Sequence, residues 1–279
     1  MAVKVITDST ADLPLDFASE LGITVVPIYV RFGNDVYRDG IDIDSDELMK
    51  KLTTLPVHPA TSQPSPADFV NVYKEFSGES DGIISIHISG KVSGTYETAS
   101  LARQIVQDTV PIEIVDSGLN SAGLAIIVIQ AARMALDGAK LSEITQEVKQ
   151  AIQETQMLGV FDTMTYLARG GRVNKAIANI SNILEIKPLL TFKDGEIVRA
   201  GLVRTFSRGI ERLYQFAAKK SSIKEMVISH SAIPEIAEQF KTLLGNLFPE
   251  DRIMVLKLGA ALGTHGGPGV LLVAVRASS

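Results

Sequence analysis

The sequence predicts an α/β protein of two domains, with a mainly parallel sheet in the N-terminal domain and a mixed α/β arrangement in the C-terminal domain. Short apolar runs alternate with helical patterns through the first half of the chain, which is typical of βαβ units. In the second half, Lys193-Asp194-Gly195 interrupts an apolar run and indicates a hairpin of antiparallel strands. The 279 residues, 46% hydrophobic and 21% charged, are enough for one large or two ordinary globular domains.

The first half of the chain shows clear start signals for its elements. Residues that favour an N-cap, Asp12, Ser45 and Ser65, stand ahead of helical patterns, and Gly33-Asn34-Asp35 predicts a hairpin turn within residues 31–41. Apolar and β-branched runs predict strands at 3–6, 23–30, 83–88 and 112–115. Helices are predicted from residue 12 and at 45–52, 65–76, 95–107, 119–136 and 142–155.

The second half combines strands of both directions with longer helices. A strand at 157–161 is followed by a glycine-rich turn at 166–171 and by the hairpin within 189–198. Helices at 206–219 and 234–247 alternate with strands at 226–229, 253–258 and 270–275. No low-complexity linker separates the halves, and we expect domains at 1–155 and 156–279, with the second domain closing a pocket against the first.

Composition and charge exclude several classes of function. The net charge of −5 gives no general attraction to nucleic acid. The absence of cysteine removes disulfides, thiolate nucleophiles and cysteine-ligated zinc, and no histidine pair has metal-ligand spacing, so we expect no metal and no cofactor. There is no secretory signal pattern, and the longest apolar run, 124–129, is too short for a bilayer. These observations favour a cytoplasmic protein.

Three loops share an unusual chemistry of hydroxyls and glycines. They are 61–65 (Thr-Ser-Gln-Pro-Ser), 89–95 (Ser-Gly-Lys-Val-Ser-Gly-Thr) and 264–269 (Thr-His-Gly-Gly-Pro-Gly). The first two stand ahead of predicted helices, where backbone N–H groups are free and the helix dipole favours an anion. None of them carries a nucleotide-binding phosphate loop or a complete acid–base constellation. The pattern therefore indicates a site for an acidic head group.

Each candidate ligand residue also has a plainer interpretation. Ser93 lies against a helix start and is the best donor of its loop, although the loop could be a polar turn. Thr61 is surplus to capping, because Ser65 already supplies a cap. His265 stands beside two glycines that allow close backbone approach, but a lone histidine is more often structural. Arg169 and Arg172 lie in a glycine-rich turn that could bind an anion or simply face solvent. Asp8 and Asp116 end strands, and we favour a capping role for both.

Several motifs in order give the chain a resemblance to the DegV family, which includes the fatty-acid-binding B subunits of bacterial fatty acid kinase. The resemblance covers essentially the whole chain. The motifs that carry it are 7–9 (Thr-Asp-Ser), 37–40 (Tyr-Arg-Asp-Gly), 61–64 (Thr-Ser-Gln-Pro), 89–96, 116–117 (Asp-Ser), 166–172 (Tyr-Leu-Ala-Arg-Gly-Gly-Arg) and 265–269 (His-Gly-Gly-Pro-Gly).

The resemblance implies a DegV-like fold of two α/β domains and a buried long-chain fatty acid, such as palmitate or oleate. The carboxylate would be held by Thr61 and Ser93, with Arg169, His265 and Gly94 nearby. A separate fatty acid kinase would be the partner, with transient membrane contact for lipid exchange, and the chain itself would not be an enzyme. Arg204, just before a helix, is a candidate docking residue for that kinase.

Two other functions stay open at the level of the sequence. One is a hydrolase or acyl transferase that uses Ser93 and His265, against which stands the absence of a Gly-x-Ser-x-Gly motif. The other is a regulatory protein whose bound lipid alters its contact with a partner.

Overall fold

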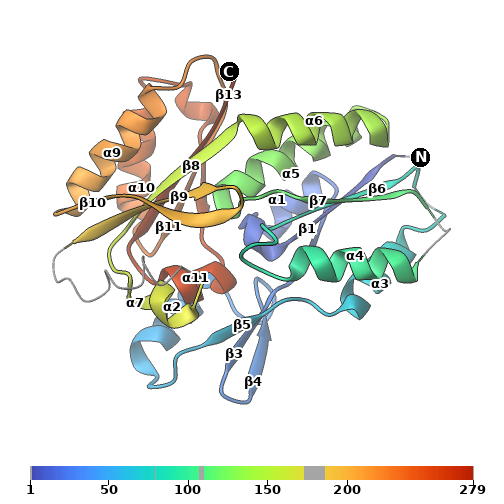
Figure 1. Cartoon of the computed structure of the whole chain (residues 1–279), viewed down its shortest axis with the longest axis horizontal. Coiled ribbons are helices and arrows are strands. Elements are labelled where there is room, and N and C mark those ends of the chain that lie inside the picture. Colours follow the sequence, from blue (N-terminus) through green and yellow to red (C-terminus); the bar gives the residue numbers. More distant parts are fainter. Residues whose placement is uncertain (1, 79, 107–109, 173–185, 279) are drawn as a thin grey trace.

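The computed structural model describes residues 2–78, 80–106, 110–172 and 186–278. Its N-terminal part contains a four-stranded sheet of order β2-β1-β6-β7, in which all neighbours are parallel. This confirms the predicted parallel sheet (Figure 1). The strands are β1 (Lys4–Asp8), β2 (Ile23–Val26), β6 (Ile83–His87) and β7 (Ile112–Asp116).

The C-terminal part contains a six-stranded sheet of order β10-β9-β8-β13-β11-β12. Its neighbours are antiparallel except β11 and β12, which are parallel, so the predicted mixed sheet is confirmed. The predicted hairpin joins β9 to β10 through Asp194 and Gly195, which both have positive φ. The strands are β8 (Thr155–Phe161), β9 (Lys187–Lys193), β10 (Glu196–Val203), β11 (Ile223–Ser231), β12 (Met254–Lys257) and β13 (Val270–Ala277).

A third, small sheet of order β4-β3-β5 projects from the N-terminal part (Figure 1). It consists of β3 (Tyr29–Phe32), β4 (Asp35–Arg38) and β5 (Ala60–Ser62). The prediction of one strand over 23–30 is wrong, because the chain leaves the parallel sheet after Val26 and enters this second sheet at Tyr29. Pro27 lies at the break and has no N–H with which to continue the ladder.

The helices begin where capping chemistry allows. Ser65 caps its helix with a full capping box to Asp68, as predicted. Two predicted caps are wrong. Asp44 rather than Ser45 caps α2. Helix α1 begins after Pro14, and Asp12 does not cap it but accepts hydrogen bonds from Ser121 and Gly259. The helices are α1 (Leu15–Glu20), α2 (Ser45–Thr54), α3 (Pro66–Glu75), α4 (Thr95–Ile105), α5 (Ser121–Leu136), α6 (Leu141–Glu154), α7 (Thr165–Gly170), α9 (Phe206–Ala218), α10 (Pro234–Leu244) and α11 (Ala260–Gly266), with short 3-10 turns η1 (Ser9–Ala11) and η3 (Glu250–Arg252). The predicted end of the fourth helix at residue 107 lies outside the described residues.

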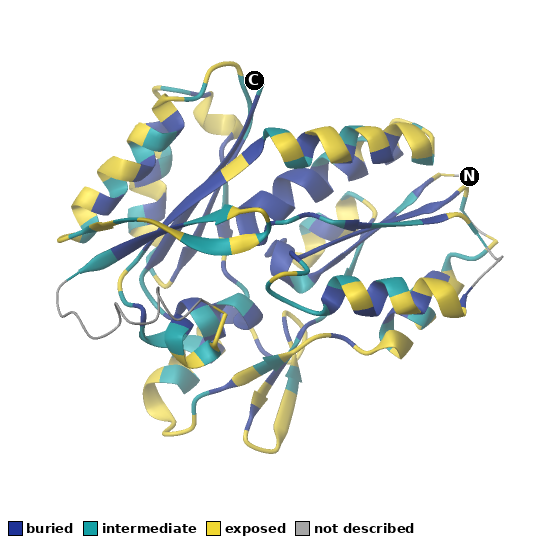
Figure 2. Cartoon of the chain, viewed as in Figure 1, coloured by how far each residue is buried: buried dark blue, intermediate teal, exposed yellow. Residues whose placement is uncertain are grey.

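Helix α5 joins the two large sheets. It packs against β1 on one side and against β11 and β13 on the other. Twelve of its 16 residues are buried, so it is dark over almost its whole length in Figure 2. One apolar cluster therefore runs from Val5 and Ile84 in the first sheet through Leu124 to Val227 and Leu272 in the second.

Sheet membership changes between α6 and β8, at residues 154 and 155. Strands before this point belong to the parallel and the small sheet, and strands after it to the mixed sheet. The domain limits of 1–155 and 156–279 stay a prediction, because α5 buries its surface against both halves.

Candidate functional site

Of the three loops predicted from the sequence, the second lies as expected, between β6 and α4, and carries Ser93. The first is a loop only in part, because Thr61 and Ser62 belong to β5, where Thr61 lies opposite Val30 of β3. His265, expected in a loop, instead lies in the last turn of α11. Glycines at 259, 263 and 266 give this segment low helix propensity, and its helix is stabilised by contacts with distant parts of the chain.

Thr61 and His265 meet, although 204 positions separate them. The Thr61 Oγ1 and His265 Nε2 atoms are 2.7 Å apart. Burial, and then nearby Arg172 and His58, lower the pKa of His265 to about 4, so the imidazole is neutral at pH 7. If Nε2 carries the hydrogen and donates it to Thr61 Oγ1, the hydroxyl hydrogen of Thr61 is free to bind an acceptor. The pair can therefore offer a donor to an anion without a buried positive charge.

The imidazole is held from the side of α7. A Cβ built on Gly170 would overlap His265 Nδ1, and one built on Gly267 would overlap the ring of Tyr166. Residues 166–171, predicted as a turn, belong largely to α7, which ends at Gly170 and has Gly171, with a φ of 67°, as its C-cap. Glycines at 170 and 267 thus let α7 and α11 approach closely enough to fix the ring of His265.

Ser93 is tied to the start of α4. Its Oγ lies 2.8 Å from Thr95 Oγ1 and accepts a long bond from Thr95 N at 3.4 Å. Gly94 is the N-cap of this helix, and a Cβ there would lie 2.6 Å from Gln63 Nε2. Gln63, two residues after Thr61, therefore packs directly on the residue next to Ser93, and the first two loops form one surface.

A narrow cavity lies beside the mixed sheet, and α7 and α11 contribute to its wall. Its walls are mostly apolar, and the space inside it amounts to about 70 Å³, which is less than small-molecule pockets usually offer. His265 and Arg172 supply polar groups to its lining, and Val92, the residue before Ser93, also lines it. The lining residues are Val92, Asn120, Met157, Phe161, Leu167, Arg172, Leu190, Thr191, Phe192, Ile197, Leu258, Leu262, His265, Gly266 and Leu272.

The two arginines of the glycine-rich turn occupy different places. Arg172 lines the cavity and donates to Gly170 O at 2.6 Å. Both arginines are exposed, and the charge of Arg169 acts on His58, whose pKa is lowered by burial first and by Arg169 second. The sequence prediction chose Arg169 for the head group, because spacing alone does not tell which of two arginines three positions apart lies at the cavity. The role of Arg169 stays a prediction.

Asp8 and Asp116 are structural, as favoured. Asp8 accepts bonds from Thr10 N at 3.1 Å and Ile88 N at 3.0 Å, and Asp116 accepts from the N–H groups of Gly90 and Gly118. Each carboxylate therefore accepts hydrogen bonds from backbone N–H groups that would otherwise lack a partner at the end of a parallel strand. Together they fix both ends of the segment that precedes Ser93.

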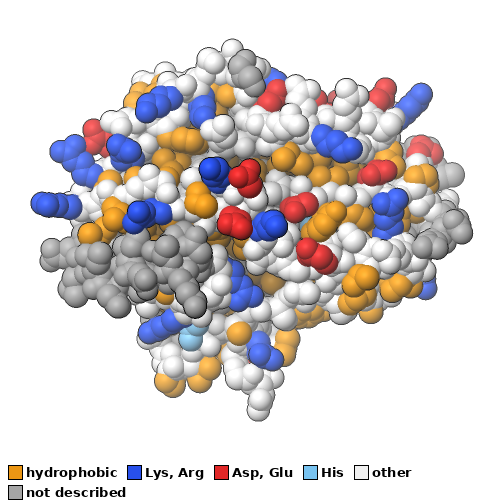
Figure 3. Space-filling model, in the orientation of Figure 1, with side chains coloured by type: hydrophobic (Ala, Val, Ile, Leu, Met, Phe, Trp, Pro, Cys, Tyr) orange, Lys and Arg blue, Asp and Glu red, His pale blue; other side chains and the backbone are white. Residues whose placement is uncertain are grey.

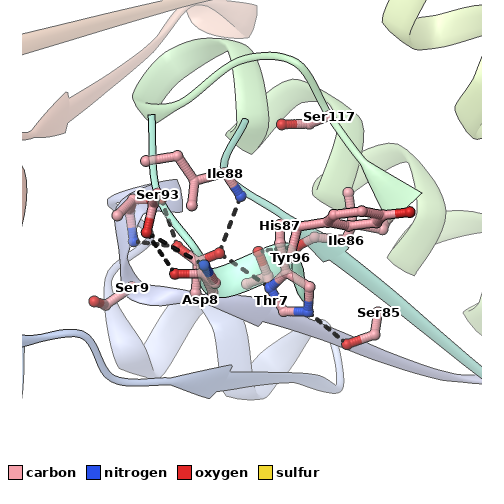
Figure 4. Close-up of polar contacts among 12 residues, drawn as sticks. Thr7, Asp8, Ser9, Ser85, Ile86, His87, Ile88, Ser93, Tyr96 and Ser117 are labelled. Atoms are coloured by element: carbon pink, nitrogen blue, oxygen red, sulfur yellow. Dashed lines mark hydrogen bonds and ion pairs between the residues drawn. The ribbon is translucent and has the colours of Figure 1, made fainter. Parts of the chain in front are cut away.

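Asp8 also belongs to a buried chain of side chains (Figure 4). His87 Nδ1 lies 3.0 Å from Asp8 Oδ2, and His87 Nε2 lies 2.7 Å from Ser85 Oγ. This is the order of groups in a serine hydrolase. However, Ser85, His87 and Asp8 are all 0% exposed, and Ser85 Oγ already accepts a bond from Tyr73. These three buried side chains are closed to a substrate, and the contact of Asp8 with His87 connects β1 to β6.

The pair suggested for a hydrolase, Ser93 and His265, lacks the corresponding arrangement. Within the described residues, the Ser93 hydroxyl pairs with Thr95 and the His265 Nε2 with Thr61, while His265 Nδ1 is buried without a hydrogen-bond partner. Among the residues that the structure describes, no carboxylate orients the imidazole, as a general base would require.

The fold and the site define a class: α/β proteins with two large sheets and a narrow apolar cavity beside the mixed sheet, which carries an imidazole and a guanidinium on its wall. Residues 2–278 match the family model described as uncharacterised proteins of the DegV family. The chain belongs to the DegV family.

Relatives and solved structures agree with this assignment. A DegV domain-containing protein of Caldanaerobacter subterraneus is 34% identical over 270 residues, which cover 95% of each chain. A DegV family protein from Thermus thermophilus, whose structure is named for fatty acid binding, superposes with a TM-score of 0.90 at 32% identity over all of both chains. DegV from Bacillus subtilis, named a fatty acid binding protein, gives 0.89 at 28% identity over all of both chains. A stearic acid-binding protein from Eubacterium ventriosum gives 0.87 at 25% over 98% of each.

Among the helices of the described ranges, none combines the length and the apolar character needed to cross a bilayer.

Proposed function

We propose that this protein binds a long-chain fatty acid, such as palmitate or oleate, and presents its carboxylate to a separate fatty acid kinase. The observation that carries the proposal is the apolar cavity on whose wall lies His265, in hydrogen-bond contact with Thr61. An acyl chain matches the apolar wall, and a carboxylate matches donors at the polar part. The fatty-acid-binding names of the structurally similar proteins support the same assignment.

The carboxylate would be held by the hydroxyls of Thr61 and Ser93. Hydrogen bonds to a charged acceptor favour its ionised form, and the nearby helix start of α4 adds favourable polarity. His265 would keep the Thr61 hydroxyl oriented, and Gly94 lets Gln63 pack closely beside Ser93. Arg169 and Arg172 would supply positive charge around the head group, the second of them from the cavity wall.

The acyl tail would supply most of the binding free energy. At ~0.8 kcal/mol for each buried methylene, about fourteen of them contribute roughly 11 kcal/mol before the costs of ordering and association are subtracted. The hydroxyls then act mainly by fixing the orientation of the chain, with its carboxylate at the polar part of the cavity.

Phosphoryl transfer to the carboxylate would take place in trans. The sequence carries no phosphate loop that could hold ATP. Arg204 is exposed, stands just before α9 and shares a surface depression with Arg208 and Arg212. Lys and Arg side chains are numerous over α9 and β10 on the left of Figure 3. This basic face would receive an acidic surface of the kinase, and lipid exchange would require transient contact with a membrane.

Lipid extraction from freshly purified, denatured protein tests the proposal directly. Mass spectrometry should find a long-chain fatty acid close to one equivalent per chain, and stripped protein should take up added palmitate or oleate. Finding no stoichiometric acyl species, together with no uptake of either acid, contradicts the proposal. ATP turnover with fatty acid by the chain alone would contradict the carrier role.

A further inference from the structure

Two buried carboxylates meet the amino end of α11. Asp39 is part of the 37–40 motif and directly follows β4; its Oδ1 accepts a hydrogen bond from Ala260 N at 2.7 Å. Asp12 accepts one from Gly259 N at 2.8 Å, also through its Oδ1. Gly259 is the N-cap of α11 and has no side chain with which to cap the helix. Two free N–H groups at this helix end are therefore bound by residues 221 and 247 positions away.

Both carboxylates are fixed on their other oxygen as well. Asp39 Oδ2 accepts from Ser9 Oγ at 2.7 Å, and Asp12 Oδ2 accepts from Ser121 Oγ at 2.6 Å. The side chains are 3% and 7% exposed. A Cβ on Gly259 would lie 3.1 Å from Asp39 Oδ1 and 3.2 Å from Asp12 Oδ1, so only the absence of a side chain lets both approach without adjustment.

The opposite end of α11 carries the imidazole of the head-group site. The helix has seven residues and is about 10 Å long. Asp39 follows β4, and Thr61 belongs to β5, so the same small sheet holds the first turn of α11 through Asp39 and the last turn through the contact of Thr61 with His265. A short helix held at both ends has little freedom to rotate or slide.

We propose that Asp39 and Asp12 are positioning residues of the head-group site, which bind the amino end of α11 and thereby hold the imidazole of His265 against Thr61. The proposal rests on the proposed function only in calling this place a head-group site. The placement of the imidazole is a property of the protein without ligand. It gives a role to the 37–40 motif, which the fatty-acid site by itself does not use.

The test is the titration of the His265 ring followed by NMR in protein without ligand, with its signals assigned by their loss in His265→Ala. In the wild type the pKa of His265 should lie near 4 because the ring is buried. In Asp39→Ala the loosened helix should let the ring reach solvent, and its pKa should rise toward the ordinary value of 6.5. Asp39→Asn keeps an acceptor for Ala260 N and should restore the low pKa. Thr205→Ala, which removes the cap of α9 on the distant sheet, is the control and should leave the ring unchanged.

A second variant keeps the proposal testable if Asp39→Ala does not fold. Gly259→Ala inserts a methyl group between the two carboxylates and α11, and it should raise the pKa of His265 in the same direction. Unchanged His265 signals in both Asp39→Ala and Gly259→Ala overturn the proposal, as does an equal change in Thr205→Ala. Titration of the wild type with palmitate is a separate measurement. Failure to bind palmitate contradicts the proposed function, whereas the His265 signals alone decide whether Asp39 and Asp12 position the ring.

Discussion

At the scale of single residues, the proposed head-group site relies chiefly on neutral donors. Thr61 and Ser93 bring hydroxyls, and His265 is neutral because burial lowers its pKa. A carboxylate in such a site is held by hydrogen bonds more than by an ion pair, so the loss of one donor should be measurable in affinity.

Thr61→Ala and Ser93→Ala should each weaken fatty acid binding without unfolding the protein. Each change removes a donor to a charged acceptor, worth ~1.5–3 kcal/mol or roughly ten- to a hundredfold in affinity. Titration calorimetry with palmitate measures the effect. Thr53→Ala and Ser100→Ala are matched controls, because those hydroxyls donate to carbonyls of their own helices. Wild-type affinity in both site variants would remove these residues from the site.

His265→Ala should separate binding from phosphoryl transfer. The tail still fills the cavity and the hydroxyls remain, so much of the affinity should be kept. The rate of acyl phosphate formation with added kinase, ATP and magnesium should fall, because a group near the developing charge is lost. The rate is measured at saturating fatty acid, and an unchanged rate there would exclude the role.

At the scale of elements, the contact of α7 with α11 is a sensitive point. Gly170→Ala places a methyl group on the ring of His265, and it should displace the ring and lower the free energy of unfolding by roughly 1–3 kcal/mol. Gly201→Ala is the control, since a Cβ there would make an ordinary contact at 3.4 Å with Leu189. Urea unfolding of both variants measures the difference. Equal free energies of unfolding would show that α7 can shift away from His265 without destabilising the protein.

Elements with strong local signals were predictable, and elements made by distant contacts were not. The capping box of Ser65 and the turn at Asp194-Gly195 encode α3 and the β9–β10 hairpin in a few adjacent residues. In contrast, α11 is rich in glycine and receives its N-terminal acceptors from Asp12 and Asp39. Such bonds leave no mark in the local sequence, so the segment that carries His265 was predicted as a loop.

The site was predictable in its residue types and less so in its geometry. Thr61 and His265 were both named, and the structure places them in contact. The place of Arg172 at the cavity and the apolar lining could not be predicted, because a residue such as Leu190 in a cavity wall has the same pattern as one in the core.

At the scale of the whole molecule, the buried acids give stability a dependence on pH. Burial raises the pKa of Asp39 from 3.8 to about 6, so stability from this group is full below pH 4 and is lost as the pH rises through 6, by about 3 kcal/mol. Relative to wild type, Asp39→Asn should therefore gain stability between pH 4.5 and 7. Urea unfolding at both pH values measures this.

Asp42→Asn is the control in the same turn. Hydrogen bonds from Arg38 lower the pKa of Asp42 to about 2, so its contribution changes only below pH 4. Its stability relative to wild type should be the same at pH 4.5 and 7. An identical pH trend in both variants would contradict the assignment of the effect to Asp39.

The position of α5 has a consequence for folding. A fragment that ends at residue 154 retains every strand of the parallel sheet, but the face of α5 that packs on β11 and β13 would be exposed to water. Such a fragment should aggregate or remain partly molten, and the intact chain should unfold in a single transition seen equally by circular dichroism and by tyrosine fluorescence. Two sheets that share one helix thus behave as one cooperative unit, and proteolysis between them would yield no stable halves.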